Sequence, residues 1–424
     1  MLRRVQLKKK HLDDYKEVAG PEVLATLRQL AGPLQGLRVL HINSTGEGGG
    51  VAELLMSLVP LMRDAGLEAE WQVLCHDDPF FEVTKGFHNA LQGKPFALNE
   101  ERRERYLRRN RTCAAMLEGS YDVIIAHDPQ PAGLRSFRPD AAAHWIWRCH
   151  IDTSRPDPEV WGFVKPFVSL YERSVFTMVE FVPPDLSGPV VAIIAPAIDP
   201  HSPKNQDLSR SHARASVAEF GVDLTRPLLL QVARFDPWKD PEGAIQTYRI
   251  AKKEVPGLQL ALIGAMAADD PEGWEIYARL EAPAAADPDI FLFTNLTGVQ
   301  AHEVNAFQRV ADVQLQKSIR EGFGLVVSEA LWKETPVIGG RVGGITLQIE
   351  DGVSGYLVDD SEEAAERVIR ICRDPELAGQ MGQAGRRCVR ERFLITRLLE
   401  DWLRLLNDVI AKGDDKPEKV EAHR

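Results

Sequence analysis

Short apolar runs alternate with longer segments of mixed apolar and polar residues, and this alternation occurs in two successive series along the chain. Short runs rich in β-branched residues are typical of buried strands, whereas apolar residues spaced three and four apart indicate helices. Strands separated by helices favour parallel sheets. The predicted strands are 38–42, 70–74, 122–126, 144–149, 175–182 and 190–194 in the first series, and 227–232, 258–263, 290–293, 313–315 and 336–338 in the second.

A segment rich in Pro, Asp and Ser, residues 196–209, separates the two series and is the best linker candidate. The chain has 424 residues, whereas single hydrophobic cores stop growing at about 250–300 residues. The sequence therefore predicts two α/β domains, each doubly wound around a parallel sheet. Because ligands of such sheets bind outside the carboxyl ends of the strands, we expect the active site in a central cleft that both domains face.

Charge and composition exclude several classes of function. Lys and Arg number 51 against 62 Asp and Glu, which gives a formal net charge of −11. A general nucleic-acid binder would present a basic face to the phosphates, so no nucleic-acid partner is expected. No apolar run approaches the ~20 residues that cross a bilayer, and the basic residues 1–10 lead into no apolar segment. We therefore expect neither a membrane partner nor a secretory signal.

The cysteines indicate the compartment. There are five, scattered along the chain, and no two have CxxC spacing: Cys75, Cys113, Cys149, Cys372 and Cys388. An odd number without such spacing indicates reduced thiols in a cytoplasmic protein, with no disulfide framework and no zinc site.

Three adjacent glycines, Gly48, Gly49 and Gly50, follow the first strand and Asn43. Glycine allows positive φ and close backbone approach, and the N-terminus of the helix that follows is suited to phosphate. The dinucleotide fingerprint G-x-G-x-x-G fails at Val51, and no Gly-Lys-Ser/Thr is present, which disfavours a dinucleotide-dependent dehydrogenase and a P-loop. The turn is thus predicted to bind an anion, the alternative being a plain flexible turn.

Polar clusters follow the next two central strands of the first series. His127 and Asp128 end one strand, and His150 and Asp152 follow the other. Histidine and carboxylate groups at strand ends predict recognition of sugar hydroxyls. A lone histidine is more often an interior residue with satisfied hydrogen bonds, but two clusters after successive strands favour a site.

The second series places charges at two strand ends. Arg234 and Lys239 follow the strand 227–232, where two cations suit a diphosphate. Glu321 and Glu329, eight positions apart, accompany two glycines at the predicted start of a helix. These carboxylates are positioned to reach different hydroxyls of one ligand.

A D-x-D string at Asp287 and Asp289 raises the question of a metal. The string precedes a strand instead of following one, so we interpret it as a turn and predict no Mg²⁺ site there.

Together these motifs resemble a family. Segments 234–239, 321–329 and 336–344 resemble the retaining glycosyltransferases with two Rossmann-like domains (GT-B), in the glycogen-synthase-like family 4. Segments 43–50, 127–131 and 147–152 narrow the resemblance to the trehalose glycosyltransferring synthases, and fungal trehalose phosphorylases share much of the pattern. In this fold the last helix crosses back to the first domain. The implied domains are 1–197 plus about 394–424 on the acceptor side and 198–393 on the nucleotide-sugar donor side.

The resemblance implies that glucose passes from a nucleoside diphosphate glucose, UDP- or ADP-glucose, to free glucose and gives α,α-trehalose. The anomeric configuration of the donor glucose would be retained, and the reaction could run in both directions. It implies no cofactor in the site, leaves Mg²⁺ open as an activator, and implies a homodimer. A front-face mechanism is favoured over a covalent carboxylate intermediate. Three alternatives remain: a trehalose phosphorylase, a family 4 transferase with another acceptor, and a catalytically silent sugar-nucleotide sensor.

The resemblance also implies residue roles, with no metal ligand among them. The catalytic residues would be His150, Glu321, Arg234 and Lys239. The ligands of the donor nucleotide and diphosphate would be Gly48, Gly49, Gly50, Arg234, Lys239, Phe323, Gly324, Leu325 and Glu329. The ligands of the sugars would be Asn43, Asp128, His150, Asp152 and Glu321.

Overall fold

The computed structural model describes residues 2–74, 78–266 and 271–414. The chain forms two compact units: unit 1 comprises Met1–Ala195 and Ile395–Arg424, and unit 2 comprises Pro196–Leu394. Each unit is built around one sheet whose strands are parallel, with a single antiparallel edge strand in unit 1. The predicted fold class, two doubly wound α/β domains, is confirmed. The break at 195/196 lies beside the expected boundary at 197/198.

The sheet of unit 1 has the strand order β1-β3-β2-β4-β5-β6-β7. From β2 the chain moves first to β3 on one side and later to β4 on the other, so the carboxyl ends of β2 and β4 form a topological switch point, where ligands of open α/β sheets bind. The strands are β1 (Leu2–Arg4), β2 (Arg38–Asn43), β3 (Glu68–Leu74), β4 (Tyr121–His127), β5 (Ala142–Arg148), β6 (Arg173–Phe176) and β7 (Val190–Ile193).

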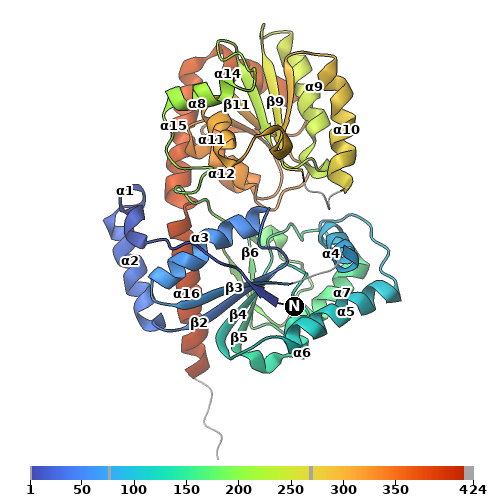
Figure 1. The fold of residues 1–424 in the computed structure, drawn as a ribbon, viewed down its shortest axis with the longest axis vertical. Coiled ribbons are helices and arrows are strands. Elements are labelled where there is room, and N and C mark those ends of the chain that lie inside the picture. Colours follow the sequence, from blue (N-terminus) through green and yellow to red (C-terminus); the bar gives the residue numbers. More distant parts are fainter. Residues whose placement is uncertain (1, 75–77, 267–270, 415–424) are drawn as a thin grey trace, which may run out of the picture. The chain divides into compact units, whose positions relative to one another are not determined.

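Helices surround this sheet, and the last of them comes from the far end of the chain. In unit 1, α16 packs beside α2 and α3 (Figure 1), and Asn407 Nδ2 donates to the Leu30 carbonyl at 2.8 Å. The predicted return of the terminal helix to the first domain is therefore confirmed. The helices of unit 1 are α1 (Lys16–Ala19), α2 (Pro21–Ala31), α3 (Gly50–Asp64), α4 (Asp78–Leu91), α5 (Glu100–Ala115), α6 (Leu134–Phe137), α7 (Pro158–Val168) and α16 (Ile395–Asp414), with short 3-10 helices at Leu12–Tyr15, Gly32–Leu34, Pro139–Ala141 and Val179–Phe181.

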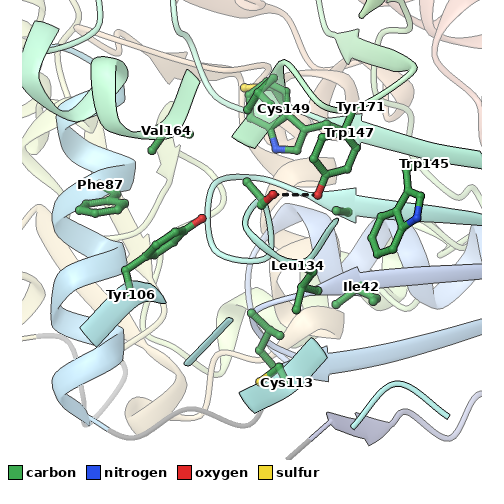
Figure 2. Packing of buried hydrophobic residues seen from close by; sticks show 14 of the residues in the cluster. Ile42, Phe87, Tyr106, Cys113, Leu134, Trp145, Trp147, Cys149, Val164 and Tyr171 are labelled. Carbon is green, nitrogen blue, oxygen red and sulfur yellow. Dashed lines mark hydrogen bonds between the residues drawn. The ribbon is translucent and has the colours of Figure 1, made fainter. Parts of the chain in front are cut away.

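Large aromatic residues fill one face of the unit 1 sheet, and their polar tips hold the loop after β4 (Figure 2). The hydroxyl of Tyr171 donates to the Ala132 carbonyl at 3.0 Å, and that of Tyr106 donates to the Pro129 carbonyl at 2.8 Å. Buried Tyr and Trp side chains need such partners. The core thus positions the strand-end loop that the sequence predicted to carry a site.

Unit 2 has the strand order β10-β9-β8-β11-β12-β13, all parallel. Leu229 of β8 enters the core on one face, whereas Leu228 and Leu230 enter the core on the other, as expected for a strand buried on both sides. The switch point lies between β8 and β11. The strands are β8 (Leu228–Val232), β9 (Gln259–Gly264), β10 (Ile290–Thr294), β11 (Val313–Gln316), β12 (Val337–Gly340) and β13 (Gly355–Val358).

The helices of unit 2 are α8 (Arg210–Ala218), α9 (Pro241–Lys252), α10 (Pro271–Ala285), α11 (Ala301–Val310), α12 (Leu325–Trp332), α13 (Ile345–Gln348), α14 (Ser361–Arg373) and α15 (Pro375–Arg392), with 3-10 helices at Pro237–Lys239 and Asn295–Thr297. An Asp-Pro pair starts both α9 and α15: the side chain of Asp240 accepts the N–H of Gly243, and that of Asp374 accepts the N–H of Leu377. Aspartate at the N-cap and proline at the first helical position are local signals.

Several sequence-based elements were wrong or missing. The predicted strand 175–182 ends at Phe176, because the apolar run continues into a 3-10 helix whose Phe181 is buried without pairing in the sheet. The segment before Gly36, predicted only as polar, contains β1, α1 and α2. Strand β13 was not predicted. Among the described residues no helix is both long and apolar enough to cross a membrane. Cys75 lies outside the described residues; the four other cysteines are free thiols.

Candidate active site

The glycine turn after β2 presents an open backbone at the start of a long helix. Gly48 (φ 69°) and Gly49 (φ 79°) occupy the left-handed region that favours glycine. A Cβ atom added to either would meet nothing within 4 Å. Gly50 is the first of the 15 residues of α3, and no side chain caps this helix. Uncapped N–H groups in a first helical turn attract anions, so this turn is suited to phosphate.

Three histidines form a hydrogen-bonded chain at the carboxyl ends of β2, β4 and β5. Nδ1 of His41 lies 3.0 Å from Nε2 of His127, and Nδ1 of His127 lies 2.9 Å from Nε2 of His150. The two polar clusters expected after successive strands are thus in direct contact. His41 was not among the expected site residues, although a histidine inside a buried apolar strand is a signal that could have identified it.

Asp128 links the first cluster to the second. Its φ of 64° lies in the left-handed region, and its Oδ1 accepts the backbone N–H of His150 at 2.7 Å. Burial raises the pKa of Asp128 to about 7, against the opposing effects of that hydrogen bond and of Arg148. Arg148 is itself buried, which lowers its pKa to about 10. This edge of unit 1 is therefore desolvated.

Asn43 and Asp152 shape loops at the same edge. The amide of Asn43 accepts from Trp71 Nε1 at 2.7 Å and donates to the Thr45 carbonyl at 2.8 Å. One carboxylate oxygen of Asp152 accepts the N–H and the hydroxyl of Ser154, at 2.9 and 2.6 Å. Both expected sugar ligands lie at the strand ends, and both also stabilise the local backbone.

Lys239 and Glu321 meet at the switch point of unit 2. Nζ of Lys239 lies 2.5 Å from Oε2 of Glu321, and the hydroxyl of Ser318 donates to the same oxygen at 3.2 Å. Both charged side chains are largely buried, 17% and 9% exposed. Two residues 82 positions apart in the sequence are thus brought into one ion pair. Ser318 also lines a cavity of about 170 Å³.

Arg234 differs from Lys239 in being open to solvent. It lies just beyond β8, 53% of its side chain is exposed, and its Nη2 contacts Oδ2 of Asp236 at 3.2 Å. A neighbouring pair joins Lys317 to Asp240, the N-cap of α9. Lys317 was not predicted, although it directly follows β11. Beyond the carboxyl ends of β8 and β11, Arg234, Lys239 and Lys317 are therefore each paired with a carboxylate.

The last residue of α13, Gln348, contacts the loop that runs from Glu321 to α12. Gln348 Nε2 donates to the carbonyls of Phe323 at 2.5 Å and Gly324 at 3.3 Å. A Cβ atom at Gly344 would lie 2.5 Å from the Phe323 backbone, so only glycine fits there. Gly324 (φ 80°) precedes Leu325, the first residue of α12. The expected backbone ligands thus occupy a turn that Gln348 holds in place. This role of Gln348 was not predicted from the sequence.

Glu329 is buried on α12, one helical turn before the buried Lys333. The side chain of Glu329 lies 4.0 Å from Lys204. One helical turn later, Lys333 Nζ donates to Asn205 Oδ1 at 2.8 Å, Gln308 Oε1 at 2.9 Å and the Glu329 carbonyl at 2.9 Å. Burial lowers the pKa of Lys333 to about 7, which the charge of Glu329 opposes. Lys333 thus ties α12 to the segment predicted as a linker.

The D-x-D string lies away from these groups, before β10. Asp287 and Asp289 both bind Lys252, at 3.0 and 2.9 Å, and Asp289 also binds Arg226 at 2.6 Å. Within the described ranges, no group of three or more His, Cys, Asp or Glu side chains is placed to hold a metal ion.

Comparison with known proteins agrees with this architecture. The family described as "Trehalose synthase, N-terminal domain" matches residues 41–183, and the family "Glycosyl transferases group 1" matches residues 214–388. In solved structures, a sucrose-phosphate synthase from Thermosynechococcus elongatus superposes with a TM-score of 0.70 at 18% identity, covering 89% of this chain and all of the other. The chain is therefore a glycosyltransferase of the two-Rossmann-domain type.

Curated relatives narrow the class. A trehalose synthase of Rubrobacter xylanophilus is 53% identical over 96% of this chain and 98% of its own, and one of Thermococcus litoralis is 48% identical over 94% and 97%. A trehalose phosphorylase of Pleurotus pulmonarius is 28% identical over 93% of this chain but only 60% of its own. The chain belongs to the trehalose synthase family.

Proposed function

We propose that the protein transfers glucose from UDP- or ADP-glucose to free glucose, with retention of the anomeric configuration, to give α,α-trehalose. The observation that carries the proposal is the ion pair of Lys239 and Glu321 at the switch point of unit 2, in a chain 53% identical to a protein named trehalose synthase. Lys239 and Arg234 supply positive charge for a diphosphate, and Glu321 supplies a carboxylate for sugar hydroxyls.

The chemistry follows from where charge develops. As the bond between the glucose C1 and the phosphate oxygen breaks, negative charge grows on that oxygen, and fixed cations aimed at developing charge are usually the largest catalytic contribution. The new bond from C1 to the acceptor oxygen forms on the same face, and the acceptor proton passes to the departing phosphate. Lys239 and Arg234 stabilise the leaving diphosphate, and because the acceptor oxygen attacks C1 directly, this path has no covalent intermediate.

The state of the carboxylates supports this front-face path. A nucleophilic carboxylate must be ionised and unhindered. Burial holds the pKa of Asp128 near 7, and its Oδ1 accepts a backbone N–H, whereas one oxygen of Glu321 is taken by Lys239 and Ser318. Asp128 is therefore partly protonated at neutral pH, and one of the two oxygens of Glu321 already has partners.

The test is product analysis. Incubation with UDP- or ADP-glucose and ¹³C-labelled glucose should give labelled α,α-trehalose, identified by NMR, and EDTA should abolish neither product nor nucleotide binding, since no cofactor is expected. An α,β product in which the unlabelled ring, the one from the donor, is the β-anomer would contradict retention, and loss of nucleotide affinity in EDTA would contradict the metal-free site. Sedimentation should show the homodimer expected from the family resemblance.

A trehalose phosphorylase is the second candidate, because a relative of that name matches 93% of the chain. Inorganic phosphate would then take the place of the diphosphate. Calorimetry with UDP, ADP and phosphate separates the two: tight binding of a nucleoside diphosphate supports the synthase, whereas binding of phosphate alone, with glucose 1-phosphate formed from trehalose, supports the phosphorylase.

A further inference from the structure

The histidine chain of unit 1 runs from the buried interior of the sheet to its edge. His41 is inside β2, His127 ends β4, and His150 follows β5. Neighbouring rings are only slightly inclined, by 27° between His41 and His127 and by 16° between His127 and His150, with centroids 5.3 and 5.2 Å apart. The nitrogen contacts of 3.0 and 2.9 Å join all three rings into one continuous series.

The three rings are uncharged. Burial lowers the pKa of His41 to about 3, and burial lowers the pKa of His127 and of His150 well below the usual value. The buried cation of Arg148 acts in the same direction on the last two. A neutral imidazole has one N–H and one lone pair. Two consecutive N···N hydrogen bonds must therefore run in the same direction, and fixing one tautomer fixes all three.

The inner end of the chain decides that direction. Nε2 of His41 is buried and has no hydrogen-bond partner among the described residues. The ring of Trp402 approaches His41 at an interplanar angle of 77°, with centroids 6.0 Å apart. If the protons pointed inward, Nε2 of His41 would carry a buried N–H without an acceptor. Orphaned buried donors are rarer than unfilled acceptors, so the empty lone pair belongs on Nε2.

We propose that His41 and His127 are positioning residues that hold His150 as the Nδ1–H tautomer, so that His150 offers the sugar a hydrogen-bond donor. Nδ1–H of His41 donates to Nε2 of His127, and Nδ1–H of His127 donates to Nε2 of His150. The remaining proton of His150 is on Nδ1. The inference rests on the proposed function in one respect: it takes the sugar as the ligand that His150 contacts.

The arrangement has a chemical consequence for transfer. Asp128 holds the backbone N–H of His150 at 2.7 Å while His127 holds its ring, so both the main chain and the imidazole are fixed. A neutral donor stabilises an oxygen without surrendering its proton. His150 would thus orient a sugar oxygen and would not act as a general base.

The direct test is spectroscopic. Two-bond ¹H–¹⁵N spectra of the full-length protein with ¹⁵N-labelled histidine report which ring nitrogen carries the proton. We expect Nδ1–H for all three histidines at neutral pH, although the Nε2–H form prevails in free histidine. Finding His150 protonated on Nε2, or on both nitrogens, would overturn the proposal. This measurement uses no substrate, so it does not depend on the proposed reaction.

A pair of substitutions tests the effect on transfer. His127→Leu removes the hydrogen bond to Nε2 of His150, so the partly buried ring of His150 should lose its fixed tautomer and kcat should fall about tenfold, the effect of one hydrogen bond. Nucleotide affinity should stay unchanged. His127→Asn offers an amide N–H near the position of Nδ1 and should restore both kcat and the Nδ1–H signal of His150. If His127→Leu does not fold, His127→Gln takes its place, because its amide lies nearer the position of Nε2, which contacts His41 and not His150.

His144→Leu is the matched control. His144 is on β5 of the same sheet, 12% exposed, and its Nδ1 contacts Glu172 at 2.7 Å, outside the histidine chain. Its substitution should change neither the His150 signal nor kcat. A folded His127→Leu protein with the wild-type tautomer of His150 and wild-type kcat, or equal losses in the Asn and Leu variants, would refute the proposal. If the tautomers respond as expected but no trehalose forms, the proposed function fails and the histidine inference stands.

Discussion

The two units share one architecture, but the side chains at the carboxyl ends of their strands differ in charge. At the strand ends of unit 1, the polar groups are buried or, for His150, partly buried, and are linked by hydrogen bonds: three uncharged histidines, and Asp128 with its pKa near 7. At the strand ends of unit 2, the groups form ion pairs, Lys239 with Glu321 and Lys317 with Asp240. Fold alone therefore does not determine how a strand end is prepared for its ligand.

The difference matches the ligands that we propose. A neutral sugar is recognised by directional hydrogen bonds, which are strongest where water is excluded. A diphosphate needs cations, and ion pairs hold those cations in place before the anion arrives. The ends of β4 and β5 in unit 1 are accordingly suited to hydroxyls, and the ends of β8 and β11 in unit 2 are suited to phosphates, as is the glycine turn after β2.

Removing the charge of Lys239 should have the largest effect. We expect Lys239→Ala to lower turnover by about 10²–10³-fold, the range for loss of one fixed donor at a site of developing charge. Arg234→Ala should act in the same direction. The measurement is kcat with a nucleoside diphosphate glucose, and Lys253→Ala, an exposed lysine at the end of α9, is the control. Wild-type turnover in folded Lys239→Ala would remove Lys239 from the site.

Asp128→Asn tests whether the carboxyl group of Asp128 is as desolvated as the structure indicates. The folded pKa of about 7 lies above the ordinary value of 3.8, so the folded state binds more protons between these limits and wild-type stability falls as the pH rises through this window. Asparagine keeps the acceptor for His150 and tolerates positive φ. Relative to wild type, the variant should gain about 2–4 kcal/mol of unfolding free energy from acidic to neutral pH. Urea unfolding at several pH values measures it, and a constant difference would contradict the prediction.

Lys333→Met tests a buried lysine of unit 2 that differs from Lys239 and Lys317. The acceptors of its Nζ described above are amide and carbonyl oxygens, not carboxylates. Near pH 10 the side chain of Lys333 is a neutral amine, and its loss leaves buried oxygens without a donor, which should cost about 1–3 kcal/mol. The folded pKa of about 7 lies below the ordinary 10.5, so the folded state binds fewer protons in this window. Wild-type stability should therefore rise from pH 7 to 10 relative to the variant. Parallel curves for the two proteins would show that Lys333 does not titrate there.

His150→Ala should have the smallest effect of the four and the most selective. We expect transfer to fall about tenfold, as for loss of one hydrogen bond, while nucleotide affinity stays within a few fold. Calorimetry with UDP or ADP beside a transfer assay separates the two quantities. Loss of nucleotide binding in a folded variant, or unchanged transfer, would mean that His150 does not contact the sugar.

Much of the fold was predictable because its signals are local. Buried parallel strands are continuous apolar runs, so β2, β4, β8 and β9 were located to within a residue or two. Asp-Pro pairs and glycines set helix starts and turns. The errors arose where an apolar run serves burial without strand pairing, as at Phe181, and where a short strand has little apolar sequence, as in β1.

The sequence by itself determined the class of the fold, the positions of strand ends and the residue types placed there, because each depends on neighbours in the chain. Only the tertiary structure decided which of those residues meet. The pairing of Lys239 with Glu321 depends on β8 and β11 lying side by side. The histidine chain depends on β2, β4 and β5 being adjacent, with their registers bringing His41, His127 and His150 to successive positions. Strand order and register arise from packing across the whole unit, which no local segment encodes.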